Sequence, residues 1–294
     1  MITQYCGACR IDTVEESTVP FRTPSSMFAD ATDELIAPHV SWMVPDYMDA
    51  ATQMLLFSFK SFVIRTERLT VLVDACVGNH KDRPSRPQWH RQNWPWLANL
   101  KALGLTPEDI DIVMCTHLHI DHVGWNTQLV DGRWVPTFPN ARYVFSADEY
   151  RHWETMLGAS EVGDNVFNDS VLPVVEAGRA DMVANDHEID HGIVLEPTPG
   201  HTPGHVALNL QDGEDTALFT GDLFHHPLQI VEPQLSSVVC TDAGLSRQSR
   251  YDFLERYGDS GAMIYPAHFT GSETGKIVSA DEGWWFNFTP TVMP

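Results

Sequence analysis

Metal-binding side chains are concentrated in the segment 116–122, where three histidines and one aspartate fall within six residues. His117 and His119 are two positions apart, so in an extended segment they project to the same side of the chain. Asp121 and His122 follow where the chain can turn into a helix. Packing these rings and a carboxylate together without a cation would cost too much desolvation free energy. Imidazole and carboxylate are expected ligands of Zn, Mn or Fe, so the segment predicts a metal site.

The overall composition is that of an acidic globular protein. With 294 residues, 43% of them hydrophobic, the chain can bury the core of a layered α/β domain, and we expect residues 1–294 to form a single domain. Its formal net charge of −22 repels phosphate backbones and anionic lipids over a Debye length of about 10 Å. We therefore predict no nucleic-acid partner and no membrane partner.

The N-terminus and the cysteines indicate a reducing compartment. Residues 1–6 have neither a basic segment nor an apolar core, and no run of about 18 apolar residues occurs, so we expect a cytoplasmic protein. The 5 cysteines are odd in number and scattered, which favours reduced thiols over a disulfide framework. Cys6 and Cys9 form a C-x-x-C pair, but no second pair completes a zinc site, so we expect both to be inert.

Residues 20–50 form a long segment with several prolines and an unusual number of large apolar residues. Such loops cover a binding cleft or pack against another subunit, while the simpler alternative is a strap over the core. We predict a lid or a dimer contact, and hence a homodimer, through this segment.

Short apolar strands precede each of the candidate ligands. The pairs are 111–115 with His117, 193–196 with His201, 217–220 with Asp222, and 262–265 with His268. Ligand sites in α/β sheets lie just beyond the carboxyl ends of strands, so the four strand ends predict one composite site. Residues 146–149 have the pattern of a capping box and predict a helix that runs to about residue 157.

The complete set of candidate ligands is sufficient for two ions. One set is His117, His119 and His201, the other is Asp121, His122 and His268, and Asp222 is available to bridge them. Each ion keeps an open position for water or substrate, which is the arrangement of catalytic sites. Two ions about 3.5–4 Å apart can share a hydroxide and polarise the bond to be attacked. We therefore predict a hydrolase with two divalent metal ions, Zn being preferred and Mn, Fe or Co the alternatives.

These motifs resemble the metallo-β-lactamase superfamily, with its H-x-H-x-D-H cluster followed by later His, Asp and His residues. The resemblance extends from Asp74 to His268 and so covers most of the chain. It implies an α/β fold, the four-layered αβ/βα sandwich, with the metals at the edge between the two sheets. The ligand roles above are carried over to the matching positions.

The resemblance is strongest to the lactonases and the methyl parathion hydrolase-like group. Asp222 and His268 separate the chain from the true β-lactamases, which carry a cysteine at the later position. In the acyl-homoserine lactonases, a tyrosine three residues after the bridging aspartate assists the substrate carbonyl and the leaving group. His225 stands at that position here, and we predict that it is a catalytic acid, because imidazole titrates near neutrality.

One histidine of the pair 225–226, and also His205, are expected to have supporting roles outside the reaction itself. His225 and His226 are adjacent and face different ways, so only one of them is expected to point into the site. The ring of His205 is expected to fix the turn of the segment 198–205, and it could also orient a metal ligand.

The resemblance implies attack by a metal-bridging hydroxide on a lactone or a carboxylic ester, with Asp121 accepting the proton of the hydroxide. An organophosphate or aryl ester hydrolase would use the same ions and is the first alternative. The second alternative is an iron-dependent persulfide-type oxidoreductase of the same fold.

The predicted substrate is a small molecule with an apolar or aromatic portion. We expect the apolar residues of 20–50 to line its pocket, together with Trp284, Trp285 and Phe286. The alternative for these three aromatic residues is simple packing of a terminal strand.

Overall fold

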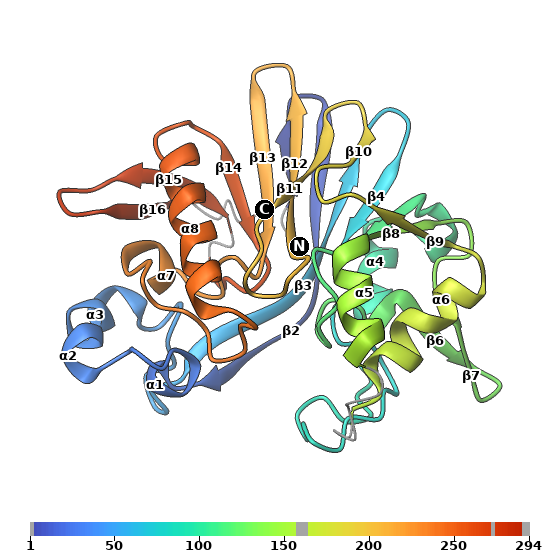
Figure 1. Ribbon diagram of the computed structural model, residues 1–294, viewed down its shortest axis with the longest axis horizontal. Coiled ribbons are helices and arrows are strands. Elements are labelled where there is room, and N and C mark those ends of the chain that lie inside the picture. The colour runs from blue at the N-terminus through green and yellow to red at the C-terminus, as the bar shows by residue number, and fades with distance from the viewer. Residues whose placement is uncertain (1–2, 157–163, 272–273, 290–294) are drawn as a thin grey trace. The chain divides into compact units, whose positions relative to one another are not determined.

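Two seven-stranded β-sheets and the helices beside them make up the computed structural model, which describes residues 3–156, 164–271 and 274–289 (Figure 1). The chain divides into two compact units, each containing one of the sheets. The first unit is Met1–Ser17 with Phe59–His187, and the second unit is Thr18–Ser58 with Glu188–Pro294. The strands β2 (Cys9–Arg22) and β3 (Leu55–Arg65) belong in part to each unit.

The sheet of the first unit has the strand order β1-β2-β3-β4-β5-β8-β9. Besides β2 and β3, its strands are β1 (Thr3–Cys6), β4 (Thr70–Val73), β5 (Ile112–Met114), β8 (Arg142–Ser146) and β9 (Ala180–Val183). The strands β4, β5, β8 and β9 run parallel, so their carboxyl ends meet at one edge of the sheet. The segment 116–122 begins directly after β5, as the sequence predicts.

Short elements complete the first unit. A hairpin of β6 (Thr127–Val130) and β7 (Arg133–Pro136) turns at Asp131 and Gly132, both of which have positive φ. The helices are α4 (Trp96–Ala102), η2 (Pro107–Asp109), η3 (Gly124–Asn126), α5 (Ala147–Met156), the π-helical turn η4 (Phe167–Val171) and α6 (Leu172–Glu176). Helix α5 lies where the capping-box pattern predicts it, since the Ser146 hydroxyl accepts from the Glu149 N–H at 3.2 Å.

The core of the first unit lies between these helices and the sheet. Val113 of β5 and Tyr143 of β8 are fully buried, and Trp96 of α4 stacks on Trp125 with ring centroids 5.2 Å apart. This packing holds β5 rigidly and so fixes where the segment 116–122 starts.

Asp169 of η4 holds two cations that are wholly buried in the first unit. Its carboxylate accepts from Arg83 Nη1 and Nη2 at 2.5 and 2.8 Å. Lys81 Nζ lies 3.6 Å from Asp169 Oδ1 and donates to Thr127 Oγ1 at 2.6 Å. Burial lowers the pKa of Lys81 to about 7. Because a buried cation without a carboxylate is very unfavourable, this cluster ties the segment 81–83 to η4.

The sheet of the second unit has the strand order β10-β11-β12-β13-β14-β15-β16. Its strands are β10 (Glu188–Asp190), β11 (Ile193–Pro197), β12 (Val206–Asp212), β13 (Asp215–Gly221), β14 (Met263–Pro266), β15 (Gly275–Ser279) and β16 (Trp284–Phe288). Helices α7 (Leu228–Val231) and α8 (Ala243–Tyr257) follow β13. Helix α8 lies against this sheet (Figure 1). Its Phe253 and Leu254 pack with Leu218 and Ile264 of the sheet.

Residues 20–50 are more ordered than a loop. They form α1 (Pro24–Met27), α2 (Asp33–Ile36), η1 (Ala37–His39) and α3 (Val40–Met43). Met27, Phe28 and Met43 are buried, whereas Trp42 is half-buried and contacts Trp285 with ring centroids 5.2 Å apart. Most of the apolar side chains therefore pack within the second unit, since short helices can bury one face.

Two further observations concern the whole chain. No disulfide joins any of the five cysteines, all of which lie in the described residues. Among the helices of the described ranges, none combines the length and the hydropathy needed to cross a lipid bilayer.

Candidate metal centre

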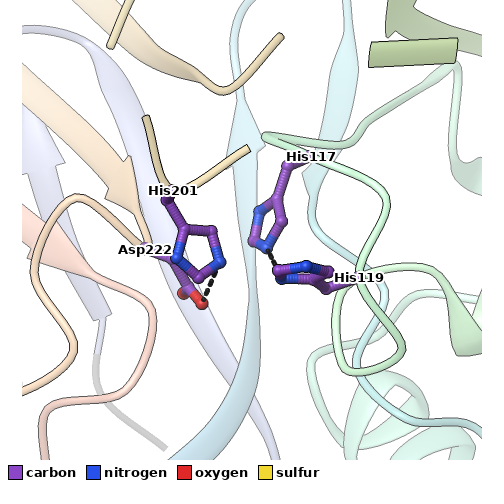
Figure 2. A group of neighbouring side chains, drawn as sticks. All are labelled: His117, His119, His201 and Asp222. Carbon is purple, nitrogen blue, oxygen red and sulfur yellow. Dashed lines mark hydrogen bonds and ion pairs between the residues drawn. The ribbon is translucent and has the colours of Figure 1, made fainter. Parts of the chain in front are cut away.

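The first unit brings together the four predicted ligands of the segment 116–122. His117 and His122 are buried, and their ring centroids lie 4.1 Å apart. His117 Nε2 lies 3.0 Å from His119 Nδ1, as the dashed line in Figure 2 marks. Asp121 Oδ1 lies 3.9 Å from His122 Nε2, and the Asp121 side chain is 13% exposed. These four side chains form the first cluster of the candidate centre.

Asp74 orients one histidine of this first cluster. Its carboxylate accepts from the Thr116 N–H at 2.8 Å and lies 2.9 Å from His122 Nδ1. Because a carboxylate only accepts, the proton of the neutral ring is on Nδ1, and the lone pair of Nε2 faces Asp121. In the sequence, Asp74 marks only the start of the family resemblance, although an acid directly after an apolar strand was a signal for this role.

Glu149 fixes the backbone between His117 and His119. Its buried carboxylate accepts from the Leu118 N–H at 3.0 Å and from Trp153 Nε1 at 2.7 Å. The Trp153 ring in turn lies 5.4 Å from the His119 ring. This role could not be predicted from the sequence, because the capping-box pattern already explains why a glutamate stands at position 149.

The backbone just after the first cluster packs closely against the segment 77–78. A Cβ atom on Gly124 would lie 1.8 Å from the Val77 carbonyl oxygen, so only glycine fits at that position. Glu16 accepts from the N–H groups of Val77 and Gly78 at 3.0 Å and from Trp125 Nε1 at 2.7 Å. Burial raises the pKa of Glu16 to about 7. No local motif in the sequence marks Glu16, because its partners are distant along the chain.

The second unit brings together His201, Asp222 and His268, and adds His225. Asp222 Oδ1 lies 2.9 Å from His268 Nε2, and Asp222 Oδ2 lies 3.2 Å from His201 Nε2 and 3.3 Å from His225 Nε2. Figure 2 shows the pair His201 and Asp222. All four side chains are buried. These four side chains form the second cluster, in which three rings point at one carboxylate.

The outer nitrogens of the three rings have defined neighbours. His268 Nδ1 lies 3.0 Å from the Ser58 carbonyl oxygen, and His225 Nδ1 lies 3.2 Å from Gln229 Oε1. His201 Nδ1 lies 3.6 Å from Cys240 Sγ. Burial lowers the pKa of His201 to about 3, so its ring is neutral, which is the form that can ligate a metal.

His205 anchors the backbone of Asp222. Its Nε2 accepts from the Asp222 N–H at 3.0 Å, so its proton is on Nδ1, which donates to Thr198 Oγ1 at 2.8 Å. The ring therefore joins the turn after β11 to the end of β13.

His226 turns away from Asp222. Its Nε2 donates to the Tyr47 carbonyl oxygen at 2.9 Å, and its Nδ1 accepts from the Leu228 N–H at 3.1 Å. Of the two adjacent histidines, His225 is therefore the one that belongs to the second cluster.

This geometry makes His226 a source of acid sensitivity. Burial lowers its pKa from 6.5 to about 4, so between these values the unfolded chain binds a proton that the folded chain does not. The free energy of unfolding therefore decreases as the pH falls from 6.5 to about 4, by about 3 kcal/mol in total. In His226→Gln, we expect the part of the pH dependence that comes from His226 to disappear. Urea unfolding of metal-free protein at several pH values would measure the free energy of unfolding of both proteins. A constant difference in unfolding free energy between the two proteins would contradict this expectation.

The donor set fits divalent cations. His268 donates its Nδ1 proton to a carbonyl oxygen, which only accepts, so the lone pair of its Nε2 faces Asp222 Oδ1 at 2.9 Å. His122 has the same arrangement toward Asp121. Two acceptors that face each other repel unless a proton or a metal cation lies between them, and imidazole with carboxylate suits Zn, Mn, Fe or Co. Histidine and aspartate side chains of both units are therefore suited to hold metal ions.

A cavity of about 210 Å³ lies beside His119 in the first unit. Its apolar lining consists of Leu118, Ile120, Trp153, Met156, Val166 and Phe167. At its edge Arg86 Nη1 lies 2.5 Å from Asp164 Oδ2. The residues differ from the predicted pocket lining, and Phe286 is instead buried in the core of the second unit.

Proteins of similar sequence include metal-dependent hydrolases. A model of the metallo-beta-lactamase superfamily matches residues 60–268. An N-acyl homoserine lactonase of Bacillus sp is 30% identical over 112 residues, which is 38% of this chain and 37% of that protein. A probable metallo-hydrolase of Mycobacterium bovis is 26% identical over 133 residues, 43% of this chain and 41% of that protein. The matched segments thus span well under half of these relatives.

Two solved structures are similar over nearly the whole chain. A hydrolase of the beta lactamase superfamily has a TM-score of 0.81 at 21% identity, covering 99% of this chain and 98% of that chain. A dizinc quorum-quenching lactonase has a TM-score of 0.77 at 16% identity, with the same coverage of 99% and 98%. At these identities the likeness concerns the fold, and it confirms the predicted α/β metallo-β-lactamase fold.

Proposed function

Because the chain belongs to the metallo-beta-lactamase superfamily, we propose that it is a metal-dependent hydrolase that opens a lactone or cleaves a carboxylic ester. The observation that carries the proposal is the buried donor set, in which ring lone pairs of His122 and His268 face the carboxylates of Asp121 and Asp222. The relatives named N-acyl homoserine lactonase support the lactone over other acyl substrates.

The ligand sets of the proposed centre follow the sequence analysis. As the resemblance implies, one ion would be held by His117, His119 and His201, the other by Asp121, His122 and His268, with Asp222 shared. Two bound divalent ions would supply Lewis acidity toward the substrate carbonyl and would lower the pKa of a water that they share. Zn is the preferred metal, since one structural neighbour is described as a dizinc enzyme.

Asp121 and His225 are the proposed catalytic residues. The Asp121 side chain is 13% exposed, so it can receive a proton from an attacking water. As the water oxygen bonds to the carbonyl carbon and the bond to the leaving oxygen breaks, a proton from His225 Nε2 neutralises the leaving alkoxide. One proton is lost by water and one is gained by the leaving group, so the hydrolysis balances.

The cavity beside His119 supports a small substrate with an apolar or aromatic portion. Its lining is mainly apolar, and one of its walls carries a predicted ligand, so a bound group would lie next to the reacting carbonyl. We propose that this cavity holds the acyl or aromatic part of the substrate.

The segment 20–50 stays a proposed lid or dimer contact. Only its less buried side chains, such as half-buried Trp42, are available for that role, because Met27 and Phe28 pack inside the second unit. Light scattering of the purified protein would test the dimer, and Trp42→Ala should then weaken it.

Metal analysis combined with a hydrolysis screen tests the proposed function. Purified protein should contain about two divalent ions per chain and hydrolyse members of a panel of lactones and carboxylic esters. Turnover of phosphotriesters alone would support the organophosphate hydrolase instead. Iron content with oxygen uptake and no hydrolysis would overturn the proposal in favour of the oxidoreductase.

A further inference from the structure

The two cysteines of the C-x-x-C pair lie opposite each other in the first unit. We propose that Cys6 and Cys9 are a redox-active dithiol, which a low-molecular-weight disulfide such as glutathione disulfide oxidises to an intramolecular disulfide. The sequence alone predicts inert thiols, because no second pair completes a zinc site. The fold changes that expectation, since it makes the two thiols partners for each other. This site is independent of the proposed hydrolase activity.

Strands β1 and β2 form a hairpin in which Cys6 pairs directly with Cys9. Directly paired residues of an antiparallel ladder project their side chains from the same face of the sheet, with Cα atoms about 4.5 or 5.5 Å apart. A disulfide needs Cα atoms between about 4.4 and 6.8 Å apart. Either type of pair meets that requirement, so a bond between the two sulfurs is compatible with the ladder.

Both ends of the hairpin hold this register. At one end, Gly7 has φ 56° and Ala8 is not among the residues with positive φ, which is the pattern of a two-residue type II′ turn. At the other end, the buried Asp12 carboxylate accepts from Thr3 Oγ1 at 2.6 Å. The thiols therefore stay opposite each other in the folded chain, which gives each a high effective concentration toward the other.

Access to the thiols requires a local opening of the hairpin. Cys6 is 2% exposed and Cys9 is 8% exposed, so the closed hairpin shields both sulfurs. Gly7 and Ala8 between them are exposed, and β1 is a four-residue strand at the edge of its sheet. Such short edge elements open at a free energy well below that of global unfolding. We therefore expect oxidation to be slower than at an exposed thiol, yet to proceed in folded protein.

A metal ion is the other ligand that two neighbouring thiols favour. Zn in a closed structural site takes four protein ligands. Within residues 3–156, 164–271 and 274–289, no group of three or more metal-binding side chains contains either cysteine. The pair therefore favours disulfide chemistry over a metal site.

The oxidation is a two-step exchange. The thiolate of one cysteine attacks glutathione disulfide, which forms a mixed disulfide and releases one glutathione thiolate. The thiolate of the other cysteine then attacks the protein sulfur of the mixed disulfide, forms the bond between Cys6 and Cys9, and releases the second glutathione thiolate. The two protons of the protein thiols pass to the two glutathione thiolates, so glutathione disulfide is reduced as the protein dithiol is oxidised. An excess of reduced glutathione reverses both steps.

Tryptic mass mapping of the whole folded chain tests the proposal. Residues 1–9 contain no lysine or arginine, so trypsin releases both cysteines in the single peptide 1–10. After incubation with glutathione disulfide and blocking of the remaining thiols, this peptide should be lighter by two hydrogen atoms and carry no blocking group. Excess reduced glutathione should restore two thiols that can be blocked. A peptide that keeps both thiols, or that carries glutathione without the internal bond, would overturn the proposal.

A register variant separates the hairpin geometry from closeness in sequence. In the double variant Tyr5→Cys with Cys6→Ser, the thiols stand at positions 5 and 9, on opposite faces of the hairpin, because side chains alternate along a strand. Tyr5 is 66% exposed, so its replacement removes no buried contact. We expect at least about 10-fold less internal disulfide than in the parent under the same conditions.

Urea-unfolded chains provide the control for this comparison. Without the ladder, the parent and the register variant should form the internal disulfide to similar extents, because both pairs are then joined by short flexible segments. Equal yields in the two folded proteins would overturn the proposal that the hairpin aligns the thiols. Mapping of the folded parent decides the proposal by itself should the variant fail to fold.

Discussion

Replacing Asp222 by asparagine is expected to abolish metal loading and turnover together. The carboxylate is the point at which the inner nitrogens of His201, His225 and His268 converge, at 2.9 to 3.3 Å. Asparagine keeps the shape but removes the negative charge and places an NH₂ group among those ring nitrogens. Loss of groups that merely orient ligands costs roughly 10-fold to 100-fold in metal affinity or activity, so loss of Asp222, the proposed shared ligand, should cost more than about 100-fold in both.

Metal content after dialysis and turnover on the best lactone or ester would measure this expectation. Asp252→Asn is the matched control, because Asp252 is exposed on α8 and bonds only Gln248 among the side chains of the described residues. The control should retain both metal and turnover. Retention of full activity by Asp222→Asn would rule out the two-metal centre.

Replacing Asp169 by asparagine is expected to lower the free energy of unfolding by about 3–5 kcal/mol. The carboxylate is the buried partner of Arg83, at 2.5 and 2.8 Å, and lies 3.6 Å from Lys81 Nζ. Both cations are fully buried and would lose their only nearby carboxylate among the described residues. An uncompensated buried charge is costly because the folded protein cannot hydrate it.

Urea unfolding of metal-free protein would measure this loss. Asp181→Asn is the control, because Asp181 pairs with Arg142 while both side chains are more than 40% exposed. Solvent screens such a pair, so the control should lose less than about 1 kcal/mol. Equal losses in the two variants would show that burial of the cluster around Asp169 does not stabilise the fold.

The features that the sequence predicted correctly are local in the chain. The α/β metallo-β-lactamase fold and the family were recognisable because each ligand follows a short apolar strand within a few residues. His117 to His122 follow β5, and Asp222 follows β13, as predicted. A strand end fixes the position of the next few residues, so strand and ligand can be read together from one stretch of sequence.

The role of the segment 20–50 shows where composition alone is insufficient. Its apolar residues suggested a surface for substrate or partner, yet Met27, Phe28 and Met43 are buried in the second unit. Composition reports that a side chain is apolar, but not which neighbour covers it. The same limit applies to the cavity beside His119, whose lining comes from four separate segments of the first unit.

The sequence by itself therefore determined the fold, the family and the kinds of ligand atoms, because these depend on residue type and short-range order. Only the tertiary structure decided how those atoms are held. Ser58 lies 210 positions from His268 along the chain, yet its carbonyl oxygen lies 3.0 Å from Nδ1 of that ring. Asp74 Oδ2 lies 2.9 Å from His122 Nδ1 across 48 positions. The tautomer of a histidine depends on what lies next to its outer nitrogen, and chain folding places that neighbour.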